Sequence, residues 1–92
     1  MSRREKNIVL LGRRDHTEAM RVAAGLTIFG HRVRLVLMDR EVEDTPENRA
    51  QAELLELSDI EPETTVAGTD LPHLSSGALA ELMVGADAVV CV

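Results

Sequence analysis

The chain has 92 residues, 45% of them apolar and 28% charged, and a net charge of −6 at neutral pH. The length predicts a single domain (residues 1–92), and the composition is typical of a soluble globular protein. Phe29 is the only aromatic residue, which argues against a nucleic-acid module that stacks bases on aromatic rings.

The charge is distributed unevenly along the chain. Residues 1–40 carry nine Arg/Lys and four Asp/Glu, a net charge of +5, whereas residues 41–92 carry one Arg and twelve Asp/Glu, a net charge of −11. The overall field repels nucleic acid and anionic membranes, so neither is an expected partner, while the N-terminal third can hold a small anion. A charged N-terminal tail (residues 1–6) with solvated helix faces is the simpler interpretation of this pattern.

The cellular compartment is predicted from what the chain lacks. Cys91 is the only cysteine, so no internal disulfide can form, which favours a reducing cytoplasm. The N-terminal "MSRREKN" is charged, and "IVLLG" after it is too short for the core of a secretory signal. No apolar run has the roughly 18–20 residues that a membrane span needs. A cytoplasmic protein is expected.

The first elements follow from the hydrophobic pattern. The run "NIVLLG" (residues 7–12) predicts a strand covered on both faces, as in a parallel sheet. Asp15, with Glu18 three residues later, has the spacing of a helix cap, and residues 16–30 predict a helix that ends at Gly30. The apolar arc of this helix is wider than packing on one sheet face requires, which favours association.

The remaining elements alternate in type. A second strand is predicted over residues 31–39, a helix beginning near Pro46 and a short strand over residues 64–67. The apolar stripe of that helix is expected at Ala50, Leu54 and Leu57, with Ala52 and Leu55 beside it. The last two elements are a helix over "SSGALAELMVGA" (residues 75–86), with a serine cap and Gly85 at its end, and the closing strand "DAVVCV" (residues 87–92).

This alternation predicts an α/β fold. We expect a small three-layer sandwich, with a mostly parallel sheet, helices on both of its faces and a flavodoxin-like strand order.

The turn after the first strand, "GRRDHTE", is the first candidate site. Ligands of open parallel sheets lie beyond the carboxyl ends of strands, against helix N-termini that favour anions. Anion-binding candidates there are Arg13, Arg14, His16 and Thr17. The turn has one glycine, so it matches neither the dinucleotide fingerprint nor a P-loop. Exposed arginines beside a capping aspartate also need no function, and that alternative stays open.

Other chemistries find little support. His16, His31 and His73 have neither metal-ligand spacing nor cysteine companions, so we expect no metal ion, and no motif indicates an organic cofactor. The serines lack the G-x-S-x-G context of a nucleophile elbow. Asp39 ends the second strand like the phospho-acceptor of receiver domains, but "GRRD" replaces the acidic pair that receivers have after their first strand.

Cys91 has two interpretations. Alternation along the closing strand puts Val90 and Val92 on one face and Val89 and Cys91 on the other. A cysteine on a buried strand is usually a small hydrophobe, which favours packing. The alternative is a reactive thiol, held as thiolate by the arginines of the first turn if the closing strand lies beside the first.

The chain resembles the DsrE/DsrF-like superfamily, the small α/β proteins of sulfur relay that include the Dsr and Tus subunits. The segments that carry the resemblance are "NIVLLG", "AMRVAAGLTIFGHRVRLVLMDREV" and "ALAELMVGADAVVCV". It implies a cytoplasmic protein that assembles with copies of itself or with sister subunits. For active members it also implies a cysteine that accepts sulfur as a persulfide and passes it to a sulfur-carrier protein.

The position of the cysteine departs from the family pattern. Active members usually hold it between the second and third helices, where this chain reads "LSDIEPETTVAGTD", without cysteine. Two versions follow: a persulfide carrier through Cys91, stabilised by Arg13, Arg14 and His16, or a non-catalytic assembly subunit. A small anion- or nucleotide-binding module that uses the first turn is the alternative from another class.

Overall fold

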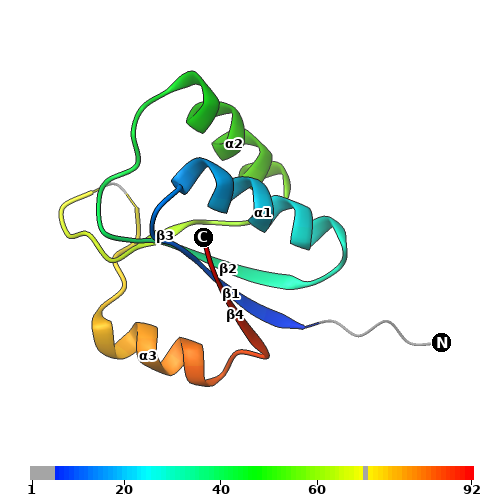
Figure 1. Cartoon of the computed structure of the whole chain (residues 1–92), viewed down its shortest axis with the longest axis vertical. Helices are drawn as coiled ribbons and strands as arrows, with labels where there is room; N and C mark the ends of the chain where they lie inside the picture. The colour runs from blue at the N-terminus through cyan, green and yellow to red at the C-terminus, as the bar shows by residue number, and fades with distance from the viewer. Residues whose placement is uncertain (1–5, 70) are drawn as a thin grey trace.

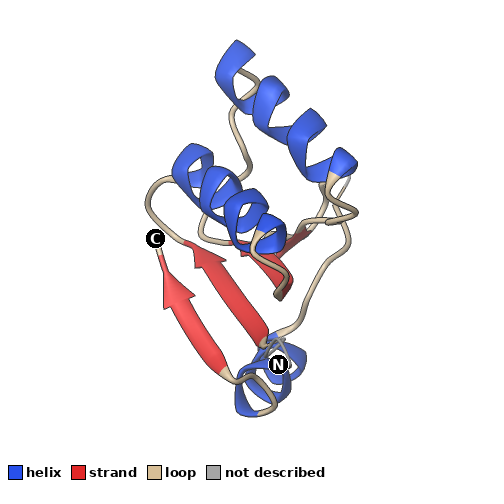
Figure 2. Cartoon of the chain, turned by 90° about the vertical axis from the view of Figure 1, so that its right-hand side faces the viewer, coloured by secondary structure: helices blue, strands red, loops and turns tan. Residues whose placement is uncertain are grey.

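The computed structural model describes residues 6–69 and 71–92, and the tail expected at residues 1–6 lies outside them except for the exposed Lys6. The elements in chain order are β1 (Asn7–Gly12), α1 (His16–Ile28), β2 (Arg32–Leu37), α2 (Pro46–Leu57), β3 (Glu63–Thr64), α3 (Ser76–Val84) and β4 (Ala88–Cys91). All strand pairs are parallel. Helices α1 and α2 cover one face of the sheet and α3 the other, which confirms the three-layer α/β sandwich (Figures 1 and 2). No helix in the described ranges combines the length and the apolar character needed to span a bilayer.

The strand order is β3-β2-β1-β4. The expected flavodoxin-like order was wrong, because in that order β1 would separate β2 from β3. Right-handed connections through α1 and α2 on the same face carry the chain outward from β1 to β2 and then β3. The connection through α3 runs over the opposite face and returns β4 to the free side of β1 (Figure 2).

Side-chain caps begin the helices where the sequence predicts them. Asp15 accepts a hydrogen bond from the Glu18 N–H (3.0 Å) at the start of α1, and Ser75 caps α3 in the same way. Thr45 caps α2, so Pro46 occupies the first helical turn, where its missing N–H costs nothing. Gly30 follows α1 with a φ of 92°, a left-handed conformation in which glycine is favoured.

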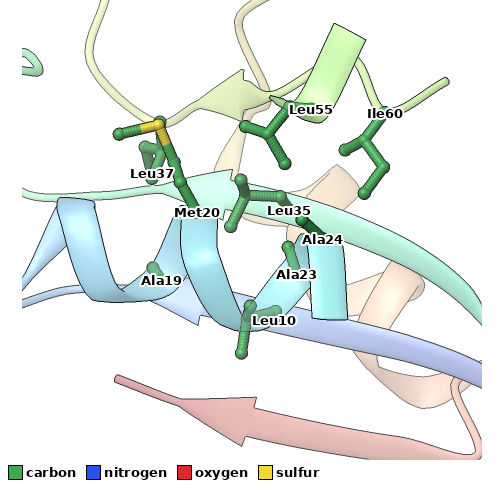
Figure 3. Packing of buried hydrophobic residues seen from close by; sticks show 9 residues of the cluster. All are labelled: Leu10, Ala19, Met20, Ala23, Ala24, Leu35, Leu37, Leu55 and Ile60. Atoms are coloured by element: carbon green, nitrogen blue, oxygen red, sulfur yellow. The ribbon is translucent and has the colours of Figure 1, made fainter. Parts of the chain in front are cut away.

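The main core lies between the sheet and α1. Figure 3 shows Leu10 of β1 and Leu35 of β2 beneath the small side chains of α1, among them Ala19 and Ala23. These alanines let the helix approach the sheet closely, so each of the four side chains is fully buried. A smaller cluster (Val9, Leu11 and Val36) lies on the opposite face, with Leu79 and Leu82 of α3 packed against it.

The predicted apolar stripe of α2 was wrong. Ala50 is exposed and Leu57 is 83% exposed, whereas Leu55, expected only beside the stripe, is buried. The buried residues of the helix are Asn48 and Leu55, seven positions apart on one face: Leu55 packs in the main core, and Asn48 accepts a hydrogen bond from Thr17 of α1. The face of α2 that packs inward therefore combines an apolar contact with a satisfied polar group.

Gly12, at the end of β1, offers a test of this close packing. A Cβ atom there would lie 2.8 Å from the Ala19 Cβ and 2.9 Å from the Leu37 Cδ2, so α1 would have to move. We expect Gly12→Ala to lower the free energy of unfolding by about 1–3 kcal/mol, as overpacked cores do.

The matched control is Gly25→Ala in the middle of α1, where an added Cβ meets no atom within 4 Å. We expect it to raise stability by about 0.5–1 kcal/mol, because alanine favours the helix. Urea unfolding followed by circular dichroism measures both. A Gly12→Ala protein as stable as the parent would contradict the packing described.

Candidate functional site

The topology identifies one end of the sheet as the place for a ligand. The connection from β1 through α1 runs over one face of the sheet, and the connection that leads to β4 runs over the other face. The strand order therefore changes direction between β1 and β4. In open parallel sheets, ligands bind in the crevice beyond the carboxyl ends of the strands at such a point. Gly12, Arg13 and Cys91 all lie at this end, because Leu11 of β1 pairs with Cys91 of β4.

The end of β4 is tied to the first turn by backbone hydrogen bonds. The Val92 N–H donates to the Leu11 carbonyl (2.8 Å), and the Val92 carbonyl accepts from the N–H groups of Arg13 (2.9 Å) and Arg14 (3.0 Å). These two N–H groups are therefore occupied. An anion at this turn has to be held by side chains or by the N–H groups that follow.

The structure exposes Cys91, so the interpretation of this residue as a packed hydrophobe was wrong. Side chains of paired residues in parallel strands point to the same face, and Cys91 pairs with Leu11 on the α3 face. Val90 and Val92 point to the other face and pack on the main core, as alternation predicted. The thiol is exposed because β4 is the outermost strand of the sheet.

A small polar cavity of about 140 Å³ lies beside the N-terminus of α1. Three of the four predicted anion-binding residues line it: Arg14, His16 and Thr17. Arg13 is not among the lining residues, and its guanidinium lies 3.8 Å from the Asp39 carboxylate, with both side chains half exposed. The remaining lining residues are Asp15, Arg40, Glu43 and Asn48.

His16 has a structural bond inside this site. Its ring is buried, and its Nε2 lies 3.0 Å from the Met38 carbonyl oxygen. A carbonyl only accepts, so Nε2 carries the proton and donates. His16 thereby joins the start of α1 to the residue after β2.

Thr17 and Asn48 form the wall of the cavity between α1 and α2. The Thr17 hydroxyl donates to the Asn48 Oδ1, and the Asn48 Nδ2 donates to the Glu43 carbonyl (2.8 Å). Asn48 is buried, so both ends of its amide need these partners. These two hydrogen bonds link the first turn of α1 to the loop after β2.

Arg40 is the functional candidate that the sequence did not identify. Its guanidinium donates to the Arg14 carbonyl (2.6 Å) and lies 3.4 Å from the Arg13 carbonyl, so it lies against the first turn. Asp39 precedes it with a φ of 72°, a left-handed turn that lets the chain reverse after β2. The signal in the sequence was that two neighbouring strands both end in charged residues, "RRD" and "DRE".

Two further arginines are paired away from the cavity. Hydrogen bonds from Arg21 hold the pKa of the Glu18 carboxyl below its ordinary value. Arg49 lowers the pKa of Asp44 in the same way. None of these four residues lines the polar cavity, whose charged lining residues are Arg14 and Arg40 together with the carboxylates of Asp15 and Glu43.

The other histidines lie outside the site. The Lys6 N–H donates to the His31 Nδ1 (3.3 Å) at the opposite end of β2, and His73 is exposed beside Thr64. Within residues 6–69 and 71–92, no group of three or more His, Cys, Asp or Glu side chains could hold a metal ion.

Comparisons with known proteins add no assignment. No protein-family model, no curated protein and no solved structure matches the chain.

The hydrogen bond between Thr17 and Asn48 can be tested by mutation. We expect Asn48→Ala to lower the free energy of unfolding by about 1–3 kcal/mol, because the Thr17 hydroxyl and the Glu43 carbonyl lose their partner. Thr17→Val should cost a similar amount.

The double variant should cost less than the two single losses added together, because both remove the same bond. Urea unfolding of the four proteins measures the coupling. Strictly additive losses would mean that the two side chains do not interact.

Proposed function

We propose that this chain is a DsrE-like cytoplasmic protein of sulfur relay, in which Cys91 accepts sulfur as a persulfide and passes it to a sulfur-carrier protein. The observation that favours this version over a purely structural subunit is the exposure of the thiol. The thiol also lies at the carboxyl end of β4, where sites in parallel sheets form. The resemblance to sulfur-relay proteins supplies the reaction class.

The chemistry requires only a thiolate and a persulfide donor. The Cys91 thiolate attacks the outer sulfur of the donor, an S–S bond forms at Cys91, and the S–S bond of the donor breaks. The donor leaves as a thiolate, so no external oxidant or reductant is needed. Because Arg13 and Arg14 lie on the turn bonded to Val92, the residue after Cys91, the proposal assigns to them the positive charge that favours the thiolate.

A mass measurement tests the carrier role. Incubation with glutathione persulfide should add one sulfur atom to the intact protein, and Cys91→Ser should remain unmodified. The double variant Arg13→Ala, Arg14→Ala should react more slowly, by up to about fivefold for each arginine removed, since an exposed charge contributes at most about 1 kcal/mol.

The matched control for charge is Arg21→Ala, because Arg21 pairs with Glu18 on α1. It should react at the parent rate. Iodoacetamide labelling of the native protein establishes that the thiol is accessible. A labelled thiol that accepts no sulfur would overturn the carrier role and leave the assembly role.

The polar cavity favours a second candidate, a small anion- or nucleotide-binding module. Arg14 and Arg40 line it together with Thr17, beside the N-terminus of α1, and an anion there would have to bind them in the presence of the Asp15 and Glu43 carboxylates. A more apolar cavity of about 260 Å³ borders the other side of Asn48. This combination suits an organic anion with an apolar part, such as a nucleoside monophosphate.

Melting temperatures test the second candidate. Inorganic phosphate and a nucleoside monophosphate should each raise the melting temperature, the nucleotide more strongly because it also reaches the apolar cavity. Arg40→Ala should weaken binding about tenfold or more, as expected for a lost hydrogen bond to a charged group. Arg49→Ala, whose partner is Asp44, is the control. No shift with either ligand would exclude this function.

A further inference from the structure

The outer side of β4 has backbone groups without a partner strand. The N–H and the C=O of Val92 both bond to β1 or to the turn that follows it. Backbone groups of successive residues point to opposite sides of a strand, so the N–H and C=O groups of Val89 and Cys91 point away from β1. Among the residues that the structure describes, no strand pairs with this side of β4. Val89 is 42% exposed, and Cys91 is exposed beside it on the α3 face.

The two edges of the sheet differ in how they are protected. The β3 edge is only two residues long and carries the ion pair between Arg34 and Glu63 (2.7 Å). The β4 edge has no charged residue and no proline from Ala88 to Val92. Proteins usually interrupt a free edge with such residues, so an edge without them is suited to pairing with another strand.

Charges at the two ends of β4 indicate the direction of the incoming strand. The exposed Asp87 lies at its amino end, where one carboxylate oxygen accepts from the Asn7 N–H. Arg14 and Arg13, the latter 3.8 Å from Asp39, lie exposed on the turn bonded to its carboxyl end. An antiparallel copy of β4 would bring its Asp87 toward these arginines at one end and its arginines toward Asp87 at the other. A parallel copy of β4 would place Asp87 beside Asp87 and the arginines beside arginines. It would also lack the twofold symmetry by which the two β4 edges cover each other.

We propose that β4 pairs antiparallel with β4 of a second copy, so that a twofold axis passes beside Val90 and the two sheets become one. This register sets Val89 of each chain opposite Cys91 of the other, so that the outward N–H and C=O groups of both residues are all bonded. The pairing also covers Val89 on the α3 face. It does not depend on sulfur transfer or on anion binding.

Sedimentation equilibrium of the full chain tests the association. We expect a dimer at micromolar concentration, and a dissociation constant raised at least about tenfold by Val89→Lys, which introduces like charges near the axis. The matched control is Leu57→Lys. Leu57 is 83% exposed at the end of α2, a helix that lies away from β4 (Figure 2), so the dimer should persist. A monomeric parent protein, or a dimer unaffected by Val89→Lys, would overturn the proposal.

Hydrogen exchange provides a readout that needs no variant. The amides of Val89 and Cys91 should exchange more slowly at dimer-forming concentrations than at high dilution. The Val90 amide, which already faces β1, should change less. Equal exchange of the Val89 and Cys91 amides at both concentrations would contradict edge pairing even if a dimer forms.

Cross-linking tests the register. In a Cys91→Ser background, Val90→Cys should form an intermolecular disulfide with oxidised glutathione, because directly opposed residues at a non-hydrogen-bonded site have Cα atoms about 4.5 Å apart. Val89→Cys in the same background faces the substituted position 91 of the second copy, which has no thiol, and should cross-link far less. Stronger cross-linking at position 89 than at position 90 would overturn this register.

Discussion

The parallel pairing of β4 with β1 is the constraint on which the candidate sites depend. Val92 donates to Leu11 and accepts from the N–H groups of Arg13 and Arg14, so the last residues of the chain hold the first turn. This contact has three consequences. It brings Cys91 beside the arginine turn, it occupies the N–H groups of Arg13 and Arg14, and it places β4 next to β1 at the edge of the described sheet.

The same end of the sheet is held from the other side by the loop after β2. Arg40 lies against the carbonyls of the first turn, and Asn48 joins Thr17 to Glu43. The polar cavity therefore has walls from α1, from α2 and from the loop between β2 and α2. Hydrogen bonds within the protein hold Arg40, Thr17 and Asn48 in these walls, so this part of the cavity is formed without a ligand.

Local patterns predicted the elements well because each depends on residues near one another in the sequence. The continuous apolar run of β1, the Asp15 and Ser75 caps and the glycine after α1 all lie where expected. Predictions that depended on which elements lie side by side in space failed more often. The strand order was wrong, and so was the buried face of α2, where the polar Asn48 turns inward to meet Thr17.

The sequence by itself determined the α/β class, the bounds of the strands and helices to within a few residues, and the set of charged residues that follow β1. Hydrophobic period and capping chemistry are sufficient for those features. Only the tertiary structure decided that Arg40 joins the first turn and that Cys91 is exposed. Both outcomes depend on which strands lie side by side: β2 brings Arg40 to β1, and among the described strands β4 pairs with β1 alone, so its cysteine is left uncovered.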